Sequence, residues 1–196
     1  MTRVADEPHL RADARRNRDA LLAAAAEVFA REGLDAPLCE IARLAGVGQG
    51  TLYRRFASRQ ALIEAIADNH LAELRLAAAR AGDGPEAFLA FFRAAVRLQS
   101  EDRGLIDLLA AHPLPEPDLL ERRRAYLATF TPLLRRAQAA SLVRRDLEPG
   151  DVRLLLQMMG AATRWAGSGG EAGGAGEAGG RPRALELVLD AMRPGA

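Results

Sequence analysis

Apolar residues recur every three or four positions along most of the chain, which is the spacing of one face of an α-helix. The first such segment is expected to begin at Asn17, a residue type favoured at helix N-caps, and to stop at Gly33. The apolar positions between Leu21 and Phe29 lie on one of its faces. The same period predicts further helices over residues 38–45, 49–56, 58–80, 85–99, 105–109, 118–140, 149–165 and 182–192. We therefore expect an all-α fold.

Shifts in composition divide these predicted helices into two units. Residues 81–88, AGDGPEAF, form a turn followed by a proline-started helix, and we place the boundary inside the long helix before it. Residues 1–16 are expected to form a flexible basic arm, 17–60 a three-helix unit and 61–196 a C-terminal helical domain. Within that domain, residues 167–180 contain eight glycines in fourteen positions and are expected to form a disordered loop.

The composition narrows the class of protein. With 49% apolar residues, a chain of 196 residues can build a hydrophobic core, which excludes global disorder. Every basic residue is arginine, so a lysine-dependent phosphate loop and Schiff-base chemistry are excluded. One cysteine, Cys39, and three widely separated histidines offer no metal-ligand spacing. We expect no metal, no cofactor and no enzymatic activity. Because no secretion signal or membrane span is found, we expect a cytoplasmic protein.

Two short predicted helices, 38–45 and 49–56, are separated by the three-residue turn 46–48, which is helix-turn-helix spacing. A helix that lies in the major groove needs a polar face for bases and phosphates and an apolar face that seats it. Leu52 and Phe56 supply the apolar face. The polar face is supplied by Gln49, Thr51, Tyr53, Arg54 and Arg55, with Gly48 and Gly50 leaving the backbone bare for a phosphate oxygen. The alternative is a helical corner with a solvated arginine face.

At these positions the sequence resembles the tetracycline-repressor (TetR) family of transcriptional regulators. The DNA-binding unit of that family carries the pattern I-A-x-x-A-G-V-x-x-G-T-L-Y-x-x-F, and residues 41–56 match every fixed position. The resemblance implies an N-terminal three-helix helix-turn-helix DNA-binding unit. It further implies a long fourth helix that joins this unit to a C-terminal effector-binding and dimerisation domain.

The resemblance also implies which residues contact DNA. Gln49 and Thr51 are expected at base edges or the adjacent backbone, and the tyrosine and arginines at phosphates. The expected set is Arg16, Gln49, Gly50, Thr51, Tyr53, Arg54 and Arg55. One departure from the family pattern is Gly48, which replaces a common capping serine; another is Pro37-Leu38, where threonine or serine is common. Alternatives to DNA contact stay open for some of these residues. Tyr53 could belong to the core and Arg16 to a solvated arm. Arg43 and Arg59 could be plain surface charges.

The C-terminal helices carry more apolar surface than one face requires. By resemblance, part of it encloses an effector, with an expected pocket lined by His70, Phe88, Phe91, Phe92, Leu105, Leu109, Tyr126, Phe130 and Met159. The alternative is that these residues only fill a core. A second apolar face suits a homodimer interface, expected at Leu155, Met158, Ala162, Leu185, Val188 and Leu189. The triple arginine at 122–124 is interpreted as a solvated face.

Together these expectations describe a sequence-specific DNA-binding regulator. We expect a homodimeric repressor that leaves a palindromic double-stranded DNA operator when an apolar or amphipathic small molecule binds, with the fourth helix as the lever. A helical ligand-binding or enzymatic protein without DNA function is one alternative. A regulator that acts through protein partners without any effector is another.

Overall fold

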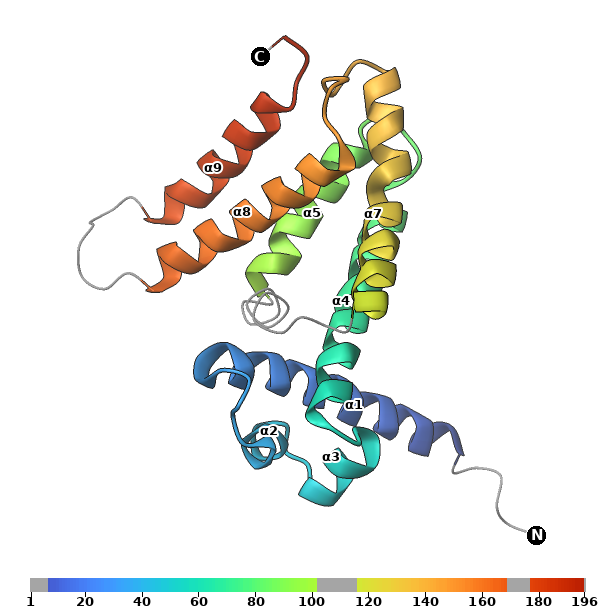
Figure 1. Cartoon of the computed structure of the whole chain (residues 1–196), viewed down its shortest axis with the longest axis vertical. Helices are drawn as coiled ribbons and strands as arrows, with labels where there is room; N and C mark the ends of the chain where they lie inside the picture. The colour runs from blue at the N-terminus through green and yellow to red at the C-terminus, as the bar shows by residue number, and fades with distance from the viewer. Residues whose placement is uncertain (1–6, 102–115, 169–176, 196) are drawn as a thin grey trace.

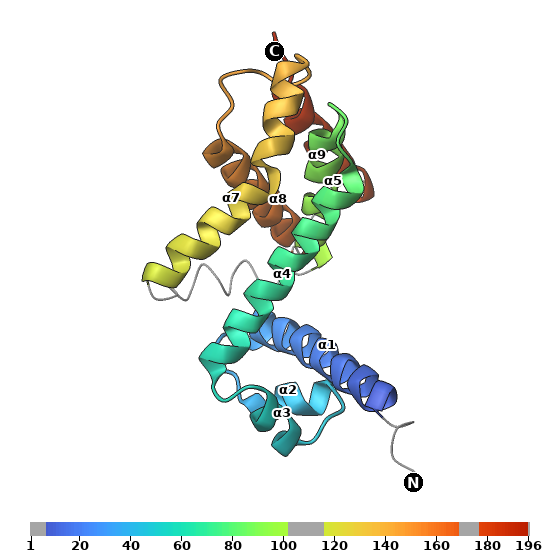
Figure 2. The same ribbon diagram turned by 90° about the vertical axis from the view of Figure 1, so that its right-hand side faces the viewer.

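A computed structural model gives the arrangement of the chain and describes residues 7–101, 116–168 and 177–195. All regular structure in these ranges is α-helical, as the apolar period predicted (Figure 1). The helices form a small N-terminal unit and a larger C-terminal unit, and α4 runs from one into the other (Figure 2). The helices are α1 (Glu7–Glu32), α2 (Leu38–Leu44), α3 (Gln49–Arg55), α4 (Arg59–Ala81), α5 (Ala87–Glu101), α7 (Glu116–Ala139), α8 (Pro149–Ser168) and α9 (Glu177–Ala191).

The N-terminal unit has its own hydrophobic core. It lies between α1, α2, α3 and the first half of α4, with α2 and α3 on one side of α1 (Figures 1 and 2). The apolar positions predicted for the first helix are the ones that are buried, because they share one face. Its largest fully buried side chains are Leu21, Ile41, Leu52, Leu62 and Ile63.

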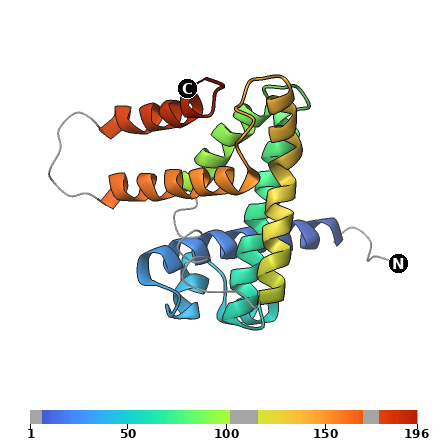
Figure 3. The same cartoon turned by 45° about the horizontal axis from the view of Figure 1, so that its top comes forward.

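A second core fills the C-terminal unit. It is enclosed by the second half of α4 together with α5, α7 and α8, and α9 packs along α8 at the edge (Figures 1 and 3). Aromatic rings occupy its centre: Phe91 stacks on Phe130 with ring centroids 5.7 Å apart, and Phe88 lies 6.3 Å from Phe92. Each unit therefore has a hydrophobic core of its own.

Helix α4 belongs to both units. Its first turn is capped by Ser58, whose hydroxyl accepts a hydrogen bond from the backbone N–H of Ala61 at 3.1 Å. It ends at Gly82, whose φ of 80° favours glycine. Ile63 and Ile66 in its first half belong to the N-terminal core, whereas Leu74 belongs to the C-terminal core. A change in the direction of α4 therefore moves one unit relative to the other.

The start of the first helix differs from its predicted position. Helix α1 begins at Glu7 instead of Asn17, so residues 7–16 are helical and the expected flexible arm is wrong for them. Pro8 lies in the first turn, where its missing N–H costs nothing, and no glycine interrupts the run that follows. Asn17 is exposed in mid-helix. Its capping preference is only a weak signal beside a long run of helix-forming residues.

The ends of the glycine-rich segment also differ from expectation. Helix α8 extends to Ser168 and α9 starts at Glu177, so both ends of the expected loop 167–180 are helical, and residues 169–176 lie outside the described ranges. A helix interior glycine costs about 1 kcal/mol. The continuous hydrogen-bonded helix that leads into the packed part of α9 offsets this cost. None of the described helices combines the length and apolar character needed to cross a membrane.

Candidate DNA-binding interface

The turn between α2 and α3 has the geometry of a helix-turn-helix. Gly46 has a φ of 68°, a left-handed conformation that favours glycine. Its backbone N–H donates to the carbonyl of Arg43 at 3.2 Å, and the N–H of Val47 donates to that of Ala42 at 3.0 Å. These two bonds close α2 and turn the chain into α3 within three residues.

Helix α3 separates its apolar residues from its polar residues as predicted. Leu52 has no exposed surface and Phe56 is buried, so this face seats α3 on the N-terminal core. On the other face, Arg54 donates from Nη2 to the hydroxyl of Thr51 at 3.2 Å. The structure brings six of the predicted contact residues together on this helix, exposed except for the half-buried threonine: Gln49, Gly50, Thr51, Tyr53, Arg54 and Arg55.

The beginning of α3 is open. Gly48 is the N-cap residue and provides no side-chain cap, as its replacement of serine implied. A Cβ atom added at Gly48 or Gly50 would meet nothing within 4 Å. The backbone at the start of α3 therefore lies at an unobstructed surface, where N–H groups and the helix dipole favour an anion.

Tyr53 lies on the surface, so the alternative that placed it in the core is wrong. Its side chain is 55% exposed, whereas the neighbouring Leu52 is fully buried. Successive residues of a helix point about 100° apart, which is why the two cannot share one face. The phenol is therefore available to a partner outside the subunit.

Of the two arginines expected to be plain surface charges, Arg59 has a different role and Arg43 does not. Arg59 is not a plain surface charge: its Nη1 donates to the backbone carbonyls of Leu34 and Ala36, the latter at 2.7 Å. Its guanidinium carbon also lies 5.7 Å from the ring centroid of Phe29. Arg59 thus fastens the start of α4 to the turn between α1 and α2. Arg43 is the expected surface charge, paired with Glu40 at 2.9 Å.

Arg16 is the predicted DNA-contact residue that lies outside α3. It is exposed on α1 and forms an ion pair with Asp13 one turn earlier. It therefore belongs to a helix instead of an arm, and its predicted contact with DNA stays a prediction.

The residues predicted to line an effector pocket are mostly packed against one another. Phe88, Phe91, Phe92 and Phe130 are fully buried in the C-terminal core, and Met159 and His70 are buried as well. Leu105 and Leu109 lie outside the described ranges. Phe91 lies against Phe130 and Phe88 lies against Phe92, with ring centroids 5.7 and 6.3 Å apart, so these rings pack in pairs. The predicted pocket stays a prediction.

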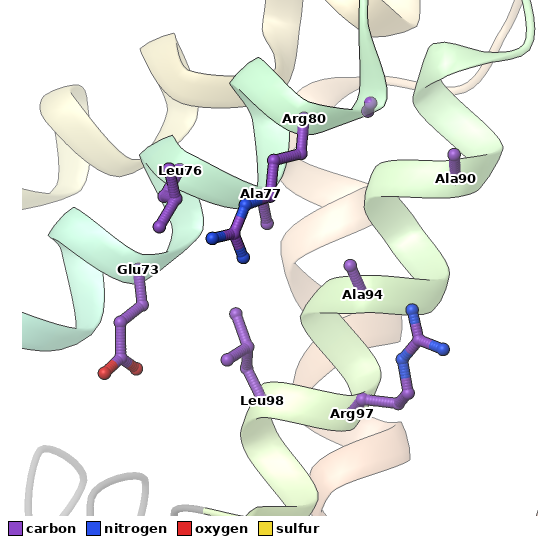
Figure 4. A pocket seen from close by; sticks show the side chains of 9 residues that line it. Glu73, Leu76, Ala77, Arg80, Ala90, Ala94, Arg97 and Leu98 are labelled. Atoms are coloured by element: carbon purple, nitrogen blue, oxygen red, sulfur yellow. The ribbon is translucent and has the colours of Figure 1, made fainter.

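Among the described residues, a hollow is lined by side chains of α4 and α5. It has a volume of about 500 Å³, and Arg80 reaches across it from α4 toward Leu98 of α5 (Figure 4). None of the predicted pocket residues lines it. The lining consists of Glu73, Leu76, Ala77, Arg80, Ala81, Ala90, Ala94, Arg97 and Leu98.

Tyr126 is a predicted pocket residue whose pKa is raised. It is half-buried on α7, and its ring meets Phe130 edge to face at 5.5 Å. Burial raises the pKa of Tyr126 to about 12, and the positive charge of Arg153 on α8 opposes this rise. The hydroxyl, which an ordinary tyrosine keeps protonated at neutral pH, here stays protonated and able to donate a hydrogen bond at more alkaline pH as well.

The predicted dimer residues differ in how exposed they are. Met158 is 66% exposed on α8, whereas Leu189 is only 2% exposed because α9 folds back onto its own subunit, so Leu189 belongs to the core and its assignment to the interface is wrong. Leu155, Leu185 and Val188 are half-buried against the core, and the side chain of Ala162 lies outside the described part. Sequence reasoning missed two exposed leucines on the same helices, Leu154 and Leu187. Leu154 precedes Met158 by one helical turn, which was the available signal.

These features define a helix-turn-helix DNA-binding protein: a tight turn after α2, an α3 packed on the core, and an exposed polar face on α3. Residues 21–66 match the family described as bacterial regulatory proteins, tetR family, and residues 83–194, more than half of the chain, match the C-terminal domain of SbtR-like transcriptional regulators. The chain therefore belongs to the TetR family of bacterial transcriptional regulators, which bind DNA and form dimers.

Solved structures and a curated relative support this membership. A TetR transcription regulatory protein from Mycobacterium vanbaalenii is 36% identical with a TM-score of 0.65; the match covers 94% of this chain and 99% of that one. A TetR regulator from Streptomyces coelicolor is 35% identical with a TM-score of 0.63, covering 91% and 99%. YvdT, an uncharacterized HTH-type regulator of Bacillus subtilis, is 50% identical over 52 residues, which are 26% of this chain and 27% of that protein.

Proposed function

We infer that the protein is a homodimeric repressor that places α3 of each subunit in successive major grooves of a palindromic operator. A small molecule bound in the C-terminal unit releases it by changing the direction of α4. In this proposal Gln49 and Thr51 lie at base edges, while Tyr53, Arg54 and Arg55 bind phosphates. A dimer with two-fold symmetry fits a palindrome whose half-sites lie about one or two helical turns apart.

The observation that carries this proposal is the division of α3 into two faces. Leu52 and Phe56 are buried in the N-terminal core, and the opposite polar face is exposed. The exposed arginines Arg54 and Arg55 have the charge that phosphate contacts need, and the open start of α3 adds backbone donors.

Support for an effector comes from one buried polar side chain in the C-terminal unit. Gln99, near the end of α5, is only 5% exposed, and its Oε1 has no hydrogen-bond partner within the described ranges. An acceptor without a partner costs free energy in a dry core. A ligand that donates a hydrogen bond and is otherwise apolar would satisfy it.

Selection of bound duplexes from random DNA by the full-length protein tests the proposed function. The expected result is an inverted repeat whose half-site centres are separated by about 10 base pairs or a multiple of that number. The recovered duplex is named the selected operator below. Enrichment of unrelated sequences, or of single half-sites only, would contradict the symmetric homodimer.

The substitution Tyr53→Phe tests the phosphate role of the exposed phenol. Affinity for the selected operator is expected to fall by about 5- to 30-fold, because the dimer loses one hydrogen bond in each of two subunits at about 0.5–1 kcal/mol each. Thermal stability should stay unchanged, since the hydroxyl is exposed. Fluorescence anisotropy gives the affinity, and calorimetry gives Tm. A lower Tm with unchanged affinity would assign the hydroxyl a structural role.

A further inference from the structure

The three consecutive arginines of α7 are not equivalent. Arg122 has a side-chain exposure of only 24%, whereas Arg123 and Arg124 are exposed. The interpretation of the whole run as a solvated face is therefore wrong for its first member. Its side chain is directed to α4, a helix more than fifty residues earlier in the chain.

Arg122 contacts two groups of α4 at once. Its Nη1 forms an ion pair with Oδ1 of Asp68 and also donates to the backbone carbonyl of Glu64 at 3.4 Å. Glu64 and Asp68 are one turn apart on α4. The two acceptors therefore fix both how far α4 lies from α7 at this point and how it is oriented relative to the Arg122 side chain. Both bonds leave the same terminal nitrogen, whose two N–H groups have fixed directions in the guanidinium plane.

The contact lies where the two units meet. Glu64 and Asp68 flank Ile66, which belongs to the N-terminal core, whereas Arg122 stands on a helix of the C-terminal unit. Five residues before Glu64, at its first residue, α4 is bonded to the turn between α1 and α2 through Arg59. Arg122 therefore connects the C-terminal unit to the portion of α4 that moves with the DNA-binding unit.

We propose that Arg122 is a positioning residue that fixes the angle between the two units, and with it the separation of the two α3 helices in the dimer. The inference rests on the proposed homodimer. Asp68 and Arg59 are nine residues apart, about 14 Å along α4 at 1.5 Å per residue, so a small rotation at the contact is enlarged at α3. The contact acts through geometry, since an ion pair with an acid that is 59% exposed adds little to folding stability.

The single native cysteine allows a direct measurement of that separation. Cys39 is exposed on α2, next to α3 in the helix-turn-helix, so a spin label on the unmodified sequence reports one position in each subunit. Electron-electron double resonance on the full-length dimer gives the distribution of distances between the two labels. The variants are Arg122→Ala and Asp68→Asn, and the matched control is Arg123→Ala.

The two test variants are expected to broaden or shift the distance distribution, and Arg123→Ala is expected to reproduce that of the wild type. Arg122→Lys, which keeps the charge but loses the two-acceptor geometry, should give an intermediate result. Circular dichroism and Tm should stay close to wild type in all four variants. A distribution unchanged in both Arg122→Ala and Asp68→Asn overturns the proposal, and so does an equal change in Arg123→Ala.

DNA binding gives a second readout. The wild type should prefer the selected operator over a duplex with two base pairs inserted between the half-sites. Loss of the contact should reduce this preference by up to about 25-fold, about fivefold for each subunit, with binding to an isolated half-site unchanged. Equal weakening on the half-site and the full operator would assign Arg122 a merely structural role and overturn the proposal.

Failure of the proposed function is distinguishable from failure of this inference. A dimer that binds no selected duplex overturns the DNA-based function, while the label distances still decide whether Arg122 sets the angle. A monomeric protein, which gives no dipolar signal, overturns the homodimer and the inference together.

Discussion

Affinity for the selected operator is expected to fall by about 10³- to 10⁵-fold when the salt concentration rises from 50 to 200 mM. A dimer that makes about 6–10 phosphate contacts releases that many condensed counterions when it binds, and the release becomes less favourable in salt. Arg16, Arg54 and Arg55 are the predicted cationic contacts, six in the dimer, and Tyr53 and the open start of α3 add uncharged donors. The salt dependence of the affinity therefore measures the contribution of these arginines to DNA binding.

The measurement is fluorescence anisotropy with the selected operator at several salt concentrations. Arg54→Ala should reduce the slope of log K against log salt by about two, one contact for each subunit. The control is Arg43→Ala, because Arg43 is exposed but paired with Glu40 on α2, and its slope should match the wild type. A nearly flat response of the wild type would contradict the assignment of the arginines to phosphates.

The DNA-binding interface could be predicted from the sequence because its determinants are local. The spacing of two short helices around residues 46–48, and the alternation of polar residues with Leu52 and Phe56 on α3, occur within about twenty consecutive residues. The periodicity of a helix converts such a pattern directly into faces. The structure confirms the separation of the two faces, and only the half-buried side chain of Thr51 is less accessible than the pattern indicated.

The roles of Arg59 and Arg122 could not be predicted in this way. Each side chain finds its acceptors on a segment distant in sequence: the turn between α1 and α2 for Arg59, and Asp68 with the Glu64 carbonyl for Arg122. An arginine beside polar residues has the same local pattern whether water or a neighbouring helix receives its hydrogen bonds. Only the packing of α7 beside α4 distinguishes Arg122 from Arg123.

The same limit applies to the division of the C-terminal apolar residues among core, pocket and interface. Periodicity shows that α8 has two apolar faces, and the structure confirms that Val152 and Leu156 point inward while Met158 points outward. The period of apolar residues could not distinguish Leu189, which is buried, from Leu187, which is exposed. That difference depends on how α9 folds against α8, a tertiary choice that apolar spacing alone does not encode.

Exposed apolar residues on α8 and α9, namely Leu154, Met158 and Leu187, lead to the second large expected effect. Met158→Glu is expected to convert the dimer to monomers and to lower affinity for the selected operator by about 10²- to 10⁴-fold, the gain that two linked half-sites provide. Met158 is 66% exposed on α8, Leu154 is exposed one turn before it, and Leu187 is exposed on α9, which packs along α8. In a two-fold interface the substitution is made twice, so two carboxylates lose water against an apolar surface.

Sedimentation velocity reports the oligomeric state, and anisotropy on the full operator and on an isolated half-site reports the consequence for DNA. The half-site affinity should stay unchanged, because α3 and its core lie in the other unit. Leu120→Glu is the matched control. Leu120 is 51% exposed and lies on α7, not on α8 or α9, so a carboxylate there should leave the dimer intact. If Met158→Glu remains dimeric at wild-type affinity, the subunits associate through another face, and the separation of the two α3 helices is set elsewhere.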